Sequence, residues 1–65
     1  MQLSYNEIWN GIEHLAENQG LSLSALATKA GLDPTSFNKS KRVGSDGRKR
    51  WPSTESMNKL LQATN

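Results

Sequence analysis

The sequence predicts a small all-α domain, a bundle of four short helices, and three observations lead to that prediction. Apolar residues recur with helical spacing in several segments, and capping residues stand directly before those segments. No segment alternates between apolar and polar residues for long enough to suggest a sheet. Since 65 residues suffice for one domain at most, we expect a single helical unit over 1–65.

Four helix starts share one local pattern: an apolar residue, a capping residue and, four positions into the helix, a second apolar residue. The capping side chain accepts a hydrogen bond from the first turn, and the two apolar side chains pack across it. The four sets are Leu3, Ser4 and Ile8; Leu21, Ser22 and Leu26; Leu32, Asp33 and Phe37; and Pro52, Ser53 and Met57. They predict helices over about 5–19, 23–30, 34–41 and 54–64.

The apolar spacing inside these segments predicts which helix faces are buried. The expected inner faces are Tyr5, Ile8, Trp9, Ile12, Leu15 and Ala16; Leu23, Leu26, Ala27 and Ala30; and Met57, Leu60, Leu61 and Thr64. Gly20 and Gly31 are expected to end the first two helices in a left-handed conformation. In the third predicted helix Phe37 faces inward, which at about 100° per residue turns Thr35, Lys39 and Arg42 outward.

The net charge of +2 is unevenly distributed along the chain. Residues 38–51 hold six cations against Asp46, a net of +5, whereas residues 1–37 sum to −3. A basic block favours a polyanion as the partner, although it can equally be a solvated loop. The turn-forming run from Gly44 to Gly47 places most of this charge in a loop over 42–51, which we expect Trp51 to anchor on the helices.

Several classes of protein receive no support from the composition. The chain has no cysteine, so it lacks disulfides and thiolate metal sites, and it has no apolar run of the ~20 residues that a membrane span needs. The N-terminus lacks the pattern of a signal peptide. His14, the single histidine, has no acid or nucleophile at a diagnostic spacing. We therefore expect a soluble, cytoplasmic protein that is not an enzyme and holds no metal and no cofactor.

The segment over 26–42 predicts a helix-turn-helix. A short helix ends at Gly31, and Asp33 and Pro34 restart the chain in a new direction. The expected outward face of the second helix carries Thr35, Ser36, Asn38 and Lys39, whose side chains suit the base edges of the DNA major groove. The same side chains would also serve an ordinary solvated helix face.

These residues resemble a known family. The run from Leu26 to Phe37 is similar to the helix-turn-helix core of the lambda-repressor-like regulators of phages and bacteria. The segment from Asn38 to Pro52, with its Gly-Arg-Lys-Arg-Trp-Pro sequence, resembles the N-terminal domain of repressors that continue into a serine-lysine self-cleaving peptidase domain. The resemblance implies a transcriptional repressor that dimerises within a longer parent chain. In isolation we expect a monomer or weak dimer, because the helices use up the apolar residues and leave no long apolar seam.

The resemblance places the base-reading positions on Pro34, Thr35 and Lys39, with Ser36 and Asn38 beside them. Pro34 and Leu23 depart from the family pattern, since relatives often have polar side chains there that contact DNA. We expect phosphate contacts from Ser22, Lys41, Arg42, Arg48, Lys49 and Arg50. The expected function is sequence-specific binding of double-stranded DNA. Two alternatives stay open: a protein-interaction module whose basic loop binds an acidic partner, and a nucleic-acid binder without sequence preference.

Overall fold

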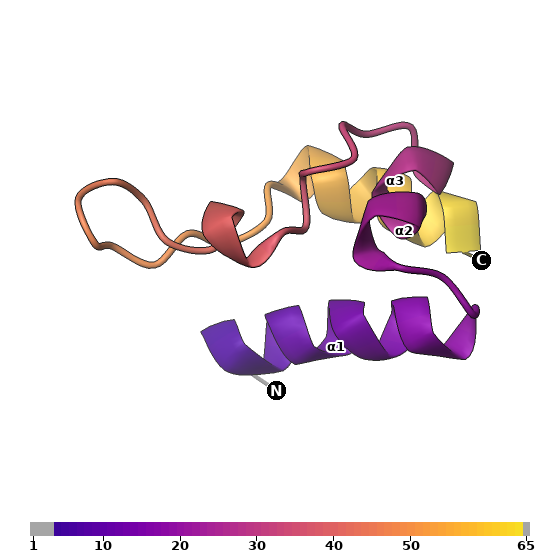
Figure 1. Ribbon diagram of the computed structural model, residues 1–65, viewed down its shortest axis with the longest axis horizontal. Coiled ribbons are helices and arrows are strands. Elements are labelled where there is room, and N and C mark those ends of the chain that lie inside the picture. The colour runs from indigo at the N-terminus through magenta and orange to yellow at the C-terminus, as the bar shows by residue number, and fades with distance from the viewer. Residues whose placement is uncertain (1–3, 65) are drawn as a thin grey trace.

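The computed structural model describes residues 4–64 and contains three α-helices, α1 (Tyr5–Asn18), α2 (Leu23–Lys29) and α3 (Thr54–Thr64). A short 3₁₀ helix, η1 (Lys39–Lys41), lies in the long connection between α2 and α3 (Figure 1). Strand pairing among the described residues is limited to one antiparallel bridge, between Val43 and Lys49. The all-α prediction is confirmed, and three of the four predicted helices are found within one residue of the expected bounds. None of the helices in 4–64 has the length and apolar character needed to cross a membrane.

The predicted caps define the beginnings of the three helices. The Ser4 hydroxyl accepts a hydrogen bond from the amide of Glu7 at 3.1 Å, and the Glu7 carboxylate accepts one from the amide of Ser4, so the two residues form a capping box. Ser22 caps α2 through the amide of Ala25, and Ser53 caps α3 through the amide of Ser56. Leu3, predicted to pack beside the first cap, lies outside the described residues.

Two glycines end α1 and α2 as expected. Gly20 has φ +68° and Gly31 has φ +78°, a left-handed conformation that other residues adopt at a cost. After each glycine, the next amide turns back to a carbonyl of the last turn, from Leu21 to Ala16 and from Leu32 to Ala27, both at 2.9 Å. The chain therefore reverses direction at both points without leaving these carbonyls unpaired.

The core forms where α1, α2 and α3 meet the segment that contains Phe37. α2 packs against both α1 and α3, and Phe37, 1% exposed, meets the indole of Trp9 edge-on with ring centroids 6.5 Å apart. The buried residues are Trp9, Ile12, Ala16, Leu26, Ala27, Ala30, Phe37 and Leu60. The predicted burial of Phe37 is confirmed. Leu61 was expected to face inward but is 58% exposed, so that prediction is wrong.

The prediction of an α-helix over 34–41 is wrong, and the four-helix bundle is accordingly not confirmed. The segment makes i to i−3 hydrogen bonds, from Ser36 to Asp33 and from Asn38 to Thr35, and Asn38 then adopts an extended backbone with ψ 150° before η1 begins. Threonine, serine, phenylalanine and asparagine are weak helix formers, and short segments of them gain little from helix propagation. Burial of Phe37 is achieved by a series of turns, so the described residues lack the second helix of a helix-turn-helix.

Because Phe37 is fully buried between α1 and the other helices, replacement by alanine should destabilise the domain by ~3–5 kcal/mol. That cost is comparable with the whole stability expected for 65 residues, about 3–10 kcal/mol at roughly 0.05–0.15 kcal/mol per residue. Urea denaturation followed by circular dichroism measures it. A Phe37→Ala variant with the parent's midpoint would contradict the burial, and Leu61→Ala serves as the exposed control.

Candidate nucleic-acid interface

The basic segment between η1 and α3 is a short hairpin. The amide of Gly44 donates to the carbonyl of Arg48 at 2.8 Å, and the amide of Gly47 donates to the carbonyl of Gly44 at 2.9 Å. Gly47 has φ +80°, which closes the turn, and the bridge between Val43 and Lys49 aligns the two arms. We call residues 42–50 the basic hairpin; Figure 1 shows its tip extending beyond the helices.

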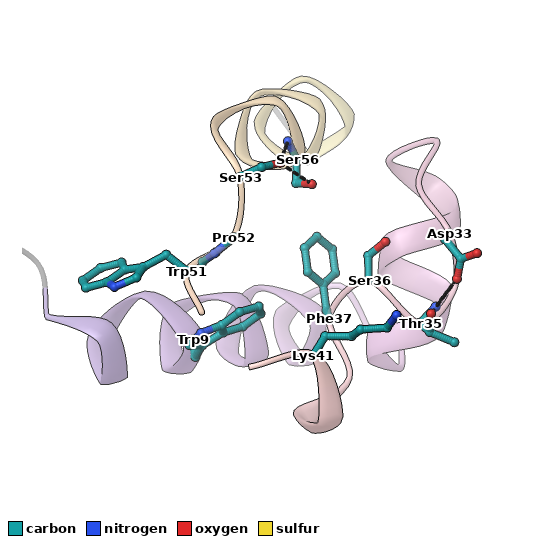
Figure 2. Close-up of a pocket in the computed structure, with 10 residues that line it drawn as sticks. All are labelled: Trp9, Asp33, Thr35, Ser36, Phe37, Lys41, Trp51, Pro52, Ser53 and Ser56. Atoms are coloured by element: carbon teal, nitrogen blue, oxygen red, sulfur yellow. Dashed lines mark hydrogen bonds between the residues drawn. The ribbon is translucent and has the colours of Figure 1, made fainter. Parts of the chain in front are cut away.

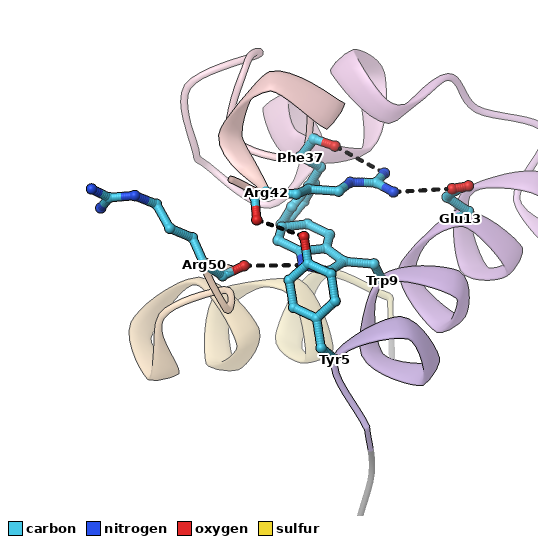
Figure 3. Close-up of polar contacts among 6 residues, drawn as sticks. All are labelled: Tyr5, Trp9, Glu13, Phe37, Arg42 and Arg50. Carbon is cyan, nitrogen blue, oxygen red and sulfur yellow. Dashed lines mark hydrogen bonds and ion pairs between the residues drawn. The ribbon is translucent and has the colours of Figure 1, made fainter. Parts of the chain in front are cut away.

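Two aromatic side chains of α1 hold both ends of the basic hairpin. The Tyr5 hydroxyl donates to the carbonyl of Arg42, and Trp9 Nε1 donates to the carbonyl of Arg50 at 3.1 Å (Figure 3). The amide of Arg50 also donates to the Arg42 carbonyl at 2.8 Å, which closes the base of the hairpin. The position of the hairpin is therefore fixed by α1.

These anchors differ from the predicted one. Trp51 was expected to pack against the helices and hold the loop, but it is 53% exposed, and the aromatic contact found for it is with the ring of Tyr5. The sequence analysis assigned Tyr5 and Trp9 to the inner face without recognising their polar atoms as anchors. Their spacing of four residues on one helix face was the available signal, because tyrosine and tryptophan usually find a hydrogen-bond partner when buried.

Arg42 belongs to the interior rather than to the surface. Its guanidinium lies over the Trp9 ring, 4.7 Å from the centroid, and donates to Glu13 and to the Phe37 carbonyl, each at 3.3 Å. The side chain is 11% exposed, so the outward orientation predicted for Arg42 is wrong. The Trp9 ring, the Glu13 carboxylate and the Phe37 carbonyl already interact with the Arg42 guanidinium. Arg42 is therefore poorly placed to bind a phosphate.

The other five cations of residues 38–51, in η1 and in the basic hairpin, are exposed. They are Lys39, Lys41, Arg48, Lys49 and Arg50. Among these five, the only ion pair in the described residues is a long one, 3.8 Å from Arg48 to Asp46, with both side chains well exposed. A pair of that kind is screened by water and contributes little. η1 and the hairpin therefore present a concentrated positive charge to the solvent.

The four predicted base-reading residues do not share one helix face, because the helix that would align them is not formed. The Thr35 hydroxyl donates to Asp33 at 2.6 Å, Ser36 and Asn38 are half-buried, and Lys39 is exposed at the start of η1. Ser22, a predicted phosphate ligand, caps α2. In Figure 1, α2 lies away from the tip of the hairpin.

An open cleft of about 350 Å³ lies beside this surface, between the turns that follow α2 and the beginning of α3 (Figure 2). Its walls are largely hydroxyl groups and aromatic rings, with one cation and one carboxylate. The lining residues are Trp9, Asp33, Thr35, Ser36, Phe37, Lys41, Trp51, Pro52, Ser53 and Ser56. A second, apolar cleft of about 210 Å³ lies between α1 and α3. Neither cleft brings a nucleophile to a histidine, and His14 is exposed on α1.

Residues 4–64 contain no group of three histidine, cysteine, aspartate or glutamate side chains arranged to hold a metal ion. No protein-family model matches the chain, and neither a curated protein nor a solved structure matches it. The resemblance to lambda-repressor-like regulators thus stays a prediction from the sequence. The case for function depends on the charges and contacts of the site itself.

One carboxylate near the site should titrate unusually. The Thr35 hydroxyl and amide both donate to Asp33 Oδ1, at 2.6 and 2.9 Å, and these two bonds, with a smaller effect of Lys41, hold the pKa of Asp33 below the usual value of an aspartate. A carboxyl with a lowered folded-state pKa stabilises the fold above its unfolded pKa, and that contribution disappears as the pH falls through the folded value. Carboxyl NMR titration should place the Asp33 midpoint below that of an unfolded aspartate. In Thr35→Val, which lacks the hydroxyl donor, the midpoint should rise; an unchanged midpoint would contradict the assigned cause.

Arg42 should be important for the stability of the fold. Breaking a buried ion pair costs about 3–5 kcal/mol, and since Glu13 is 33% exposed we expect Arg42→Gln to cost ~1–3 kcal/mol. Arg42→Lys should recover only part of this, because an ammonium cannot present the guanidinium fork to Glu13 and Phe37 together. Thermal unfolding of both variants measures the cost. If both melt with the parent, the internal contacts of Arg42 do not support the fold.

Proposed function

We propose that this domain binds double-stranded DNA through its phosphate backbone and serves as the DNA-binding part of a transcriptional repressor. The observation that carries the proposal is the presentation of exposed cations on a hairpin whose two ends are bonded to α1. Arg48, Lys49 and Arg50 stand together on the outgoing arm, while Lys39 and Lys41 come from η1.

Phosphate binding fits this arrangement better than a merely solvated loop does. Each lysine or arginine that neutralises a phosphate releases a condensed counterion, and this entropy gain drives association with duplex DNA. A cation on a flexible loop loses conformational freedom when it binds, whereas the anchored hairpin has less to lose. The hydrogen bonds from Tyr5 and Trp9 therefore support affinity without themselves contacting DNA.

Sequence reading is a separate part of the proposal. Thr35, Ser36, Asn38 and Lys39 carry groups that pair with base edges, which supports readout in a groove. One observation favours the second candidate, binding without sequence preference: in the described residues these four side chains stand on turns and a 3₁₀ helix rather than on an α-helix. Selection of bound duplexes from a random pool separates the two candidates. An enriched motif supports the repressor, and an unenriched pool supports the second candidate.

Neutralising the outgoing arm should reduce the salt dependence of duplex binding. With Arg48, Lys49 and Arg50 all replaced by glutamine, we expect the slope of log affinity against log salt to decrease by ~2–3, at about 0.9 per phosphate contact. The loss should be nearly equal on a selected and on a scrambled duplex, because phosphate contacts carry no sequence information. Fluorescence anisotropy of labelled duplexes at several salt concentrations measures the salt slope and the loss of affinity on each duplex.

The matched control removes charge elsewhere. Lys29 bonds Gln19 on the surface and Lys59 pairs with Glu55, so Lys29→Gln/Lys59→Gln lowers the net charge by two outside the basic segment. The slope of this control should stay at the parent value. Equal reductions in the control and the triple variant would show a non-local charge effect. Absence of duplex binding by the parent at low salt would overturn the proposed function and favour an acidic protein partner.

A further inference from the structure

The two tryptophans of the chain have opposite environments. Trp9 is 3% exposed and uses its ring and its N–H within the fold, whereas Trp51 is 53% exposed. Trp51 is the single aromatic residue among the large exposed apolar residues of the described chain, the others being Val43 and Leu61. A half-exposed indole presents a flat apolar surface on which another ring can stack.

Positive charge lies close to Trp51, through Lys49 and their common neighbour Tyr5. Lys49 and Arg50 directly precede it in the sequence, and both are exposed. Lys49 Nζ lies 5.3 Å from the centroid of the Tyr5 ring, and the Tyr5 ring meets that of Trp51 at 5.9 Å with an interplanar angle of 79°. Lys49, Tyr5 and Trp51 therefore form one surface cluster, in which an aromatic plane stands beside positive charge.

The backbone at Trp51 is held on both sides. The preceding carbonyl, of Arg50, accepts the hydrogen bond from Trp9, and the following Pro52 restricts the backbone of Trp51 to extended conformations. Figure 2 shows the Trp51 ring directed away from Phe37 and the core. Tyr5 and Trp9 bond to the two ends of the hairpin, and the Trp51 ring adds an edge contact with Tyr5 while more than half of it stays exposed.

We propose that Trp51 stacks on an unpaired base of single-stranded DNA while Lys49 and Arg50 contact the phosphates on either side of that base. Stacking on an aromatic plane is how many proteins bind single strands without sequence preference, and neighbouring cations follow the backbone. Within a duplex the base faces are covered by their neighbours, so this site takes single strands, overhangs or opened duplex. The proposal rests on the proposed function for its phosphate contacts and adds a second form of DNA to it.

Tryptophan fluorescence gives the first test. Titration of the parent with oligothymidylate should quench the emission of the exposed Trp51. Titration with a blunt duplex of the same length should leave most of the Trp51 emission unquenched. In Trp51→Phe the remaining emission comes from buried Trp9 and should not respond to oligothymidylate. Unquenched emission in the parent at saturating oligothymidylate would overturn the stacking, and that measurement needs no variant to fold.

Affinity gives the second test, by anisotropy on labelled oligothymidylate and on the blunt duplex. Trp51→Leu should lose about 10-fold to 100-fold in affinity for the single strand, the range expected for one stacked base, and less than about 2-fold for the duplex. Trp51→Phe should fall between Trp51→Leu and the parent. Leu61→Ala, which removes exposed apolar surface on α3, should bind both ligands like the parent.

The outcomes separate the two proposals. If the parent binds the duplex and Trp51→Leu binds single strands as tightly as the parent does, the base-stacking site is overturned and the proposed function stays in place. Equal losses on both ligands also overturn it, since Trp51 would then support the hairpin. Binding to single strands that depends on Trp51, with no duplex binding, supports the site and overturns the proposed function.

Discussion

The contacts of Trp9 connect the core of this domain to its charged surface. Its ring packs against Phe37 inside, receives the guanidinium of Arg42 on its face, and its Nε1 donates to the carbonyl of Arg50. One buried side chain of α1 therefore fixes the start and the end of the basic hairpin at the same time. Because Phe37 is held in the same cluster, the turns after α2 are positioned by the same ring.

That arrangement divides the cations of the basic segment into two kinds. Arg42 is paired with Glu13 and buried, and it stabilises the base of the hairpin, while the cations on η1 and on the outgoing arm remain in solvent. The net charge of the segment alone does not distinguish buried Arg42 from the five exposed cations. The partition matters for the proposed function, because a cation that already has a carboxylate and an aromatic face gains little from a phosphate, whereas an exposed cation gains the full counterion release.

The same cluster also explains why the two tryptophans differ. Trp9 has its N–H and its ring engaged within the fold, whereas Trp51 lies at the surface with its edge against Tyr5, the ring that Lys49 also approaches. A domain that presents cations and an aromatic plane together is chemically suited to DNA in two forms, since phosphates are common to duplexes and single strands and an uncovered base face belongs to single strands.

The sequence by itself determined the three helices, their caps and their glycine ends, because each depends on contacts within a few residues: Ser4 with Glu7, Ser22 with Ala25, and Gly20 after the last turn of α1. It also identified Phe37 as buried.

Only the tertiary structure decided the rest. The segment over 34–41 has weak helical preference, so burial of Phe37 and the bonds of Asp33 determine its turns. The anchors of the hairpin join residues 37 and 41 positions apart, Tyr5 with Arg42 and Trp9 with Arg50, and no local pattern encodes such pairs. The burial of Arg42 and the exposure of Trp51 follow from those long-range contacts, which is why both were predicted the other way round.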